Sequence, residues 1–380
     1  MDWLLGKKDE SKKWITQLSD PSRRTQAANE LIRLGPAAVD GLLEALVGRD
    51  ANLSGMAETL LVRLGPPSIP RLSEILASAH PETRQRVADI LGEMRHPGAL
   101  APLTEAARGE FYTVRARAAT ALAKIGDPQA VPVLIELLSD KEAPVRQASA
   151  LAVGTFKDPR CLLRLTDVLL EDPEIEVRQA AAQGLSTSRL TQSVPYLLDA
   201  MDDSFWWYGR EGVAKPLLDA ILSFGADAVL PLCEALRHPE GNIRFHAAEL
   251  LGQIRDPRAI EPLGMAVYDV HQIVGEAAAQ ALARYGTSAI EVLQEATRAA
   301  EASIRIHALS GLSHINDERV LPLIAELIHD ADRGVMKQAI QSLADTRNPK
   351  ALPLLEPFAA DRTDRERSML ARNAMRQLQS

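Results

Sequence analysis

The sequence has few aromatic residues, only two cysteines and no excess of positive charge. Phe, Trp and Tyr make up 4% of the 380 residues, whereas apolar residues together make up 46%, a balance typical of a helical stack rich in alanine and leucine. Cys161 and Cys233 lie far apart in the chain, so we expect no disulfide scaffold and predict a reducing, cytoplasmic location. The formal net charge of −8 argues against a general nucleic-acid binder, because such proteins derive much of their affinity from neutralising phosphates.

The chain also has no long apolar run and no motif of a common catalytic site. No apolar stretch approaches 18 residues, which predicts that no helix spans a membrane. The first residues, MDWLLGKKDESKK, contain an apolar patch of only three residues and are not expected to be a secretory signal. Neither a glycine-rich phosphate loop nor a nucleophile elbow is present. We therefore predict a protein that is not an enzyme, with no catalytic residues, no metal site and no cofactor.

A repeated helical hairpin is the main feature that the sequence does contain. In residues 114–125, apolar side chains recur at steps of three and four, which is the period of a helix. Gly126 suits a helix C-cap, Asp127-Pro128 predicts a turn, and a second helix is expected over residues 131–138. One such pair buries only part of its apolar surface, so neighbouring pairs must stack to complete a core.

The same hairpin recurs along most of the chain. The residue after the first Val of each unit defines a register of eleven units, of which the second and the seventh are degenerate. The register positions are Arg24, Ser54, Arg84, Arg115, Arg146, Arg178, Lys215, Arg244, Val274, Arg305 and Met336. The second unit carries Gly55 inside its predicted helix. We expect a cap segment and first helix at residues 1–20, the repeats at 21–361 and a C-terminal capping helix at 362–380.

These units resemble HEAT repeats, in the short HEAT-like variety also found in phycobilin lyases. The resemblance is carried by IGDPQAVPVLIELLSD followed by VRQASALAVG, and it covers residues 21–361. It implies an all-α fold, a right-handed α-α superhelix of about eleven helix pairs, in which the Val-Arg helix of each pair lines the concave face. It also implies that an Asp six residues before the Arg pairs with it, as Asp140 would with Arg146 and Asp172 with Arg178.

The period breaks once, between Arg178 and Lys215, where the step is 37 residues. The extra residues, near 202–212, hold four of the fifteen aromatic residues in the chain. Insertions in repeat proteins lie on one face, often the binding face, and exposed Trp, Tyr and Arg dominate interface energetics. The alternative is that the rings fill a wedge where the superhelix changes curvature, and the sequence supports the two interpretations equally.

Positions one, two and five residues after the register are expected to point away from the core, and the resemblance places them along the concave groove. The second position is His or Glu in units eight to ten, whereas it is apolar in units five and six. Adjacent repeats stack about 10 Å apart, which is too wide for a preformed metal site whose ligands converge at about 2 Å. The predicted partner-binding residues are Phe205, Trp206, Trp207, Tyr208, Arg210, Phe245, His246, Glu249, Glu276 and His307.

The sequence therefore favours a scaffold that binds a protein or peptide in the concave groove and through the aromatic insertion. The resemblance implies a second hypothesis, an accessory subunit that assists attachment or removal of a phycobilin chromophore. A helical-repeat nucleic-acid glycosylase or binder is the third, and the negative net charge disfavours it. An iron hydroxylase built on similar repeats uses His-Glu dipeptides, and this sequence contains none.

Overall fold

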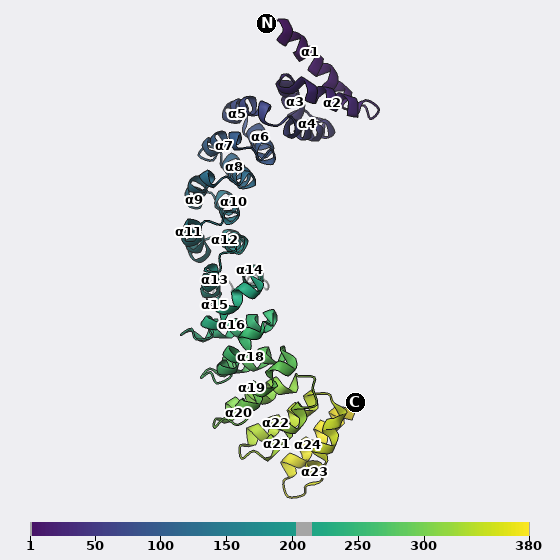
Figure 1. The fold of residues 1–380 in the computed structure, drawn as a ribbon, viewed down its shortest axis with the longest axis vertical. Coiled ribbons are helices and arrows are strands. Elements are labelled where there is room, and N and C mark those ends of the chain that lie inside the picture. The colour runs from purple at the N-terminus through teal and green to yellow at the C-terminus, as the bar shows by residue number, and fades with distance from the viewer. Residues whose placement is uncertain (1, 203–214, 380) are drawn as a thin grey trace. The chain divides into compact units, whose positions relative to one another are not determined.

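The computed structural model describes residues 2–202 and 215–379, and for residues 2–9 and 202 it describes the backbone alone. Within these residues the chain consists of helices joined by turns (Figure 1). Contacts between residues divide the chain into two units, residues 1–190 and 191–380, each of which is a stack of helices.

The first unit contains α1 (Asp2–Gln17), α2 (Arg24–Leu34), α3 (Val39–Leu46), α4 (Ala51–Leu64), α5 (Ile69–Ser78), α6 (Pro81–Glu93), α7 (Leu100–Ala106), α8 (Tyr112–Ile125), α9 (Val131–Leu137), α10 (Ala143–Gly154), α11 (Pro159–Glu171) and α12 (Ile175–Ser188). The second unit contains α13 (Ser193–Asp202), α14 (Lys215–Leu222), α15 (Val229–Ala235), α16 (Gly241–Ile254), α17 (Ile260–Ala266), α18 (Gln272–Ala283), α19 (Ile290–Ala296), α20 (Ala302–Ser313), α21 (Val320–Glu326), α22 (Arg333–Asp345), α23 (Leu352–Ala360) and α24 (Arg365–Gln379).

Each unit has two layers of helices. Helices α6, α8, α10 and α12 of the first unit pack against one another in chain order, as do α16, α18, α20, α22 and α24 of the second (Figure 1). Each of these even-numbered helices also packs against the odd-numbered helix that precedes it. The stacking of one pair on the next buries the apolar face that a single pair leaves open, as the repeat pattern predicts.

The hairpin predicted over residues 114–138 forms α8 and α9. Helix α8 ends at Ile125, and Gly126 then adopts the left-handed conformation, with φ of +72°, that the predicted C-cap requires. The Asp127 side chain accepts a hydrogen bond from the Gln129 N–H at 2.9 Å and holds the turn into α9. In other repeats an arginine takes the left-handed position instead of glycine, at Arg95, Arg189, Arg255 and Arg347.

Small residues allow the even-numbered helices to approach one another closely. A Cβ atom on Gly92 of α6 would lie 2.8 Å from the Ala121 Cα atom of α8. A Cβ atom on Gly252 of α16 would lie 2.8 Å from the Ala281 Cβ atom of α18. The alanine-rich composition thus reflects helices that meet close to their backbones, with buried leucines filling the space on either side.

Arginines of the even-numbered helices join successive repeats. Arg115 of α8 donates from Nε and Nη2 to the Asp140 carboxylate at 2.7 and 2.8 Å, and from Nη1 to the Gly109 and Glu110 carbonyl oxygens at 3.0 and 2.8 Å. We call such an Arg–Asp pair, with the two carbonyl contacts, a rung. The same carboxylate pairing joins Arg146 to Asp172, Arg244 to Asp269 and Arg305 to Asp330.

The rungs correct the pairing that the resemblance implies. Asp140 does not pair through its carboxylate with Arg146, because that carboxylate faces Arg115 of the preceding repeat. Arg146 instead donates to the backbone carbonyl oxygen of Asp140 at 2.9 Å. Asp140 lies in the loop between α9 and α10, and its Oδ1 also accepts the Glu142 N–H at 2.9 Å, which turns the carboxylate toward the earlier repeat.

The register of the ninth unit starts one residue later than predicted. Val274 is fully buried, as Val114 and Ile243 are in their own units, so Gly275 takes the position that arginine holds in the rungs. Glu276 therefore lies one residue after the register position, and its side chain is exposed. The predicted register fails here because no arginine marks it.

Among the described helices, none is both long enough and apolar enough to cross a membrane by itself. One bent pair, Lys215–Leu222 with Gly225–Ala235, reaches the required length and composition, with 99° between its two helices.

Candidate functional site

A surface pocket between α16 and α18 brings together three of the predicted partner-binding residues. Phe245 and Glu249 come from α16, and Glu276 comes from α18 in the next repeat. Phe245 and Glu249 are four residues apart and therefore lie on one face of α16. The cavity measures about 150 Å³. The remaining lining residues all belong to α18 or the residue after it: Ile273, Ala277, Gln280, Ala281 and Arg284.

The pocket combines acidic and apolar side chains. Glu249 is solvated, and its Oε2 lies 3.7 Å from Nδ1 of the half-buried His246. Glu276 is exposed, and its Oε1 accepts a hydrogen bond from Gln280 Nε2 at 3.2 Å. The His246 ring packs edge-on against Phe245, with 5.1 Å between the ring centroids. Two solvated carboxylates next to an aromatic ring suit a group that is both apolar and positively charged.

Apolar side chains are exposed where α18 begins. Val270, in the turn before the helix, is 90% exposed, and Ile273, in its first turn, is 57% exposed. Tyr268 lies in the same turn and is also exposed; partial burial and the Glu295 carboxylate raise the pKa of its phenol, which stays neutral at physiological pH. Exposed apolar side chains rimmed by polar ones are characteristic of interaction sites.

His307 does not line this surface, contrary to the prediction. Its side chain is only 3% exposed, and its Nδ1 lies 3.2 Å from the Val267 carbonyl oxygen. The ring fills the space beside Gly275, where a Cβ atom would meet it at 2.5 Å. Because Gly275 has no side chain, the histidine of the next repeat turns inward, and it cannot contact a partner.

The predicted binding residues of the aromatic insertion cannot be placed relative to this pocket. Phe205, Trp206, Trp207, Tyr208 and Arg210 lie outside the described residues. Within the residues that the structure does describe, no group of three or more His, Cys, Asp or Glu side chains is placed to hold a metal ion. Burial raises the pKa of the Cys161 thiol to about 11, so this thiol is protonated at neutral pH.

Sequence reasoning missed Ile273, Val270 and Arg284 as parts of this surface. The sequence does contain a signal for Ile273. This residue directly precedes the buried Val274, so its position can be compared with the matching position in other units. The residues at the matching position of six other units are Thr113, Pro144, Glu176, Asn242, Ser303 and Gly334. An isoleucine at a position that is polar, proline or glycine in those units marks an apolar side chain with no place in the core.

A family model of HEAT repeats matches residues 69–153, 133–217, 217–283 and 290–376. These matches cover well over half of the chain and follow the stacked helix pairs. The chain belongs to the HEAT-repeat family. The predicted fold class, an all-α superhelix of HEAT-like helix pairs, is confirmed by this match together with the observed helices.

This HEAT-repeat protein is also similar to phycocyanobilin lyase subunit beta of Pseudanabaena tenuis (strain PCC 7409). The two sequences are 30% identical over 122 residues. The match spans 32% of this chain and 42% of the lyase subunit. The resemblance to the short repeats of phycobilin lyases is thereby confirmed, over about a third of the chain.

Solved structures with similar folds include the karyopherin Kap121p. Kap121p bound to Ste12p has a TM-score of 0.52 and 13% identity, and the match covers 97% of this HEAT-repeat chain and 49% of that one. Kap121p bound to the extreme C-terminus of the protein phosphatase Cdc14p has a TM-score of 0.51 and 13% identity, with coverage of 97% and 50%. At this identity the likeness concerns the fold alone.

Proposed function

We propose that this HEAT-repeat protein is a non-catalytic scaffold that binds a protein or peptide segment across α16 and α18. The observation that carries the proposal is the pocket lined by Phe245, Glu249 and Glu276, which continues into the exposed Ile273. The HEAT resemblance assigns the even-numbered helices to the concave side, so the bound segment lies along that groove. Such scaffolds bind through a few apolar anchors surrounded by polar contacts.

The side chains of the pocket define the chemistry of the segment. An apolar side chain of the partner enters between Phe245 and Ile273, and a neighbouring Lys or Arg meets the carboxylates of Glu249 and Glu276. The −8 net charge of the chain supports a basic partner, because opposite charges increase the rate of association. Arg284, at the end of the pocket, orients an acidic group further along the segment.

The aromatic insertion is the second part of the proposed partner surface. Its support is the sequence alone: Phe205, Trp206, Trp207, Tyr208 and Arg210 are large, and they interrupt an otherwise regular repeat. Solved structures with this type of fold hold protein segments, as Kap121p does with Ste12p and with the Cdc14p C-terminus. This parallel supports a scaffold function at the level of the fold.

Selection from a random peptide display library tests the proposal without a known partner. We expect enrichment of peptides with a bulky apolar residue next to Lys or Arg. Binding of these peptides is expected to weaken in Glu249→Gln and Glu276→Gln, because each variant removes a carboxylate but keeps the shape of the side chain. Selection with no enrichment, or enriched peptides that bind the two variants as well as wild type, contradicts the proposal.

A double variant, Trp206→Ala with Trp207→Ala, tests the insertion separately. Selected peptides that bind this variant as tightly as wild type, while its circular dichroism is unchanged, remove the insertion from the partner surface. In that case the proposal would be limited to the α16–α18 pocket, which does not depend on the insertion.

A second candidate function is an accessory role in attaching or removing a phycobilin. It is favoured by the identity of 30% over 122 residues with the phycocyanobilin lyase beta subunit. Titration of the purified protein with phycocyanobilin, followed by absorbance, tests it. A saturable spectral change supports the bilin role, and an unchanged spectrum excludes stable bilin binding by this chain alone.

A further inference from the structure

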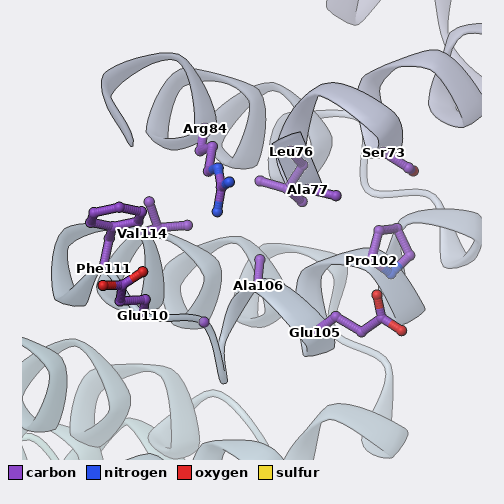
Figure 2. A pocket seen from close by; sticks show the side chains of 11 residues that line it. Ser73, Leu76, Ala77, Arg84, Pro102, Glu105, Ala106, Glu110, Phe111 and Val114 are labelled. Carbon is purple, nitrogen blue, oxygen red and sulfur yellow. The ribbon is translucent and has the colours of Figure 1, made fainter. Parts of the chain in front are cut away.

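One rung of the first unit lacks its carboxylate, and a pocket opens at that place. In the rungs of Arg115, Arg244 and Arg305, the aspartate lies 25 residues after the arginine. The position 25 residues after Arg84 of α6 is Gly109. Figure 2 shows the Arg84 guanidinium directed into the resulting cavity, which measures about 220 Å³.

The backbone at Gly109 is the same as in a complete rung. The Gly109 N–H donates to the Ala106 carbonyl oxygen at 3.1 Å, and the Asp140 N–H donates to Leu137 at the same distance. Asp269 and Asp330 make the equivalent contact at 3.1 and 3.2 Å. The loop therefore keeps the geometry of a rung, and only the side chain that carries the carboxylate is missing.

Arg84 keeps one of the two backbone contacts of a rung, but makes it through Nε, whereas Arg115 uses Nη1. Its Nε donates to the Ala79 carbonyl oxygen at 2.7 Å, and its guanidinium carbon lies 5.6 Å from the Phe111 ring centroid. Neither Nη atom has a hydrogen-bond partner within the described parts of the chain, whereas Arg115 uses both. A half-buried guanidinium that is held from one side, with two donors open toward a cavity, is prepared for a carboxylate.

The remaining walls of the cavity fit the body of an acidic side chain. Leu76 and Ala77 of α5 lie on one side of Arg84, and Phe111 lies on the other (Figure 2). Glu105 and Glu110 also line the cavity, but both are exposed, and neither forms an ion pair with Arg84 among the described residues. A carboxylate that enters from a partner meets the two Nη atoms of Arg84, whereas Asp140 meets Nε and Nη2 of Arg115.

We propose that the cavity between α5, α6 and the α7–α8 turn binds an aspartate or glutamate side chain of a protein partner, which completes the rung of Arg84. In the complete rungs, the group that the arginine binds is an aspartate carboxylate from the following loop. Arg84 lacks that carboxylate, so an acidic side chain of a partner supplies the same chemical group. This site lies in the first unit and is independent of the α16–α18 pocket. Neither site requires the other to be correct.

Arginine Nε–H NMR signals of the full-length protein test the site, with N-acetyl-glutamic acid N-methylamide as the probe. The Arg84 signal, assigned with Arg84→Lys, is expected to shift in a saturable manner. The matching glutamine compound is expected to leave it unchanged. A carboxylate on residue 109 would compete, so Gly109→Asp should weaken probe binding about tenfold or more. Gly109→Ala, which adds the same Cβ atom without the carboxylate, is the matched control and should bind the probe like wild type.

Several results would overturn the proposal. These are no shift of the Arg84 signal, an equal shift with the glutamine compound, or undiminished binding in Gly109→Asp. Binding that emerges only in Glu110→Gln would show that Glu110 itself pairs with Arg84 in solution, which also overturns it. Acetate that binds as tightly as the blocked glutamate would retain a carboxylate site but overturn its assignment to a side chain of a protein partner.

Discussion

The Nδ1 atom of His307 lies 3.2 Å from the carbonyl oxygen of Val267, 40 residues earlier in the chain. Arg86 makes the equivalent contact, because its Nη1 donates to the Leu46 carbonyl oxygen at 2.6 Å across the same separation of 40 residues. Each contact occurs where the rung arginine is absent, at Gly275 and at Ser54. In both cases a side chain of the following repeat reaches back and contacts a carbonyl oxygen eight residues before the vacant register position, whereas a rung arginine binds the carbonyls five and six residues before its own.

We predict that Arg86→Ala destabilises the first unit by about 1.5–3 kcal/mol, the typical contribution of a hydrogen bond to a charged group. The variant removes the donor to Leu46 and to the Ser54 hydroxyl oxygen, which Arg86 Nη1 approaches to 2.6 Å. The measurement is urea unfolding followed by circular dichroism. Arg117→Ala is the matched control, because Arg117 is exposed and lies 3.8 Å from Asp89, and it should change stability by less than about 0.5 kcal/mol.

The aspartates of the rungs are predicted to make stability fall in acid. Burial opposes ionisation of Asp140, but hydrogen bonds from Arg115 and the Glu142 N–H outweigh it, so the pKa of Asp140 is lowered. The pKa values of Asp269 and Asp330 are lowered in the same way. A depressed folded-state pKa stabilises the protein above the unfolded value of about 4, and this contribution disappears as pH falls through the folded-state value.

The variant Asp140→Asn tests this pH dependence. It is expected to lose about 3 kcal/mol at pH 7, because it leaves the buried Arg115 guanidinium without a counter-charge. The difference in unfolding free energy between wild type and variant should then shrink as pH is lowered below about 4. A difference that stays constant down to pH 2 would show that the Asp140 carboxylate does not contribute through its charge.

Two glycines of helix interiors are predicted to respond in opposite directions to alanine. In Gly252→Ala the new Cβ atom would lie 2.8 and 2.9 Å from the Cβ and Cα atoms of Ala281, so α16 and α18 must separate, at about 1–3 kcal/mol. In Gly55→Ala the new atom meets nothing within 4 Å, so the reduced backbone entropy of the unfolded chain stabilises α4 by about 0.5–1 kcal/mol. Thermal unfolding of both variants decides the matter, and a loss of stability in Gly55→Ala would contradict the account.

The repeat architecture was predictable from the sequence because its signals are local. Buried residues such as Val114 and Leu122 recur at helical spacing, and Gly126 with Pro128 marks the turn in the sequence itself. The rungs were predicted one repeat out of place, because the partner of Arg115 lies 25 residues away and no local pattern tells which neighbour the Asp140 carboxylate faces.

The candidate site was predictable only in part. The helical period places Phe245 and Glu249 on one face, and the repeat places Glu276 near them, which the pocket reproduces. His307 was misplaced because its orientation depends on the absence of a side chain at Gly275 in another repeat. The same kind of absence, at Gly109, produces the Arg84 cavity. A missing side chain leaves no periodic signal in the sequence. These two features could therefore be found only in the three-dimensional structure.

The affinity of a selected peptide for wild type and two serine variants tests the central claim most directly. Ile273→Ser changes an apolar residue that lines the α16–α18 pocket, and Leu230→Ser changes one of similar exposure, 60% against 57%, on the odd-numbered helix α15. If α16 and α18 hold the partner segment, fluorescence anisotropy should show the dissociation constant rising about tenfold in Ile273→Ser and staying unchanged in Leu230→Ser. Equal affinity for Ile273→Ser and wild type, with both variants folded, would contradict the claim that this pocket is the binding site.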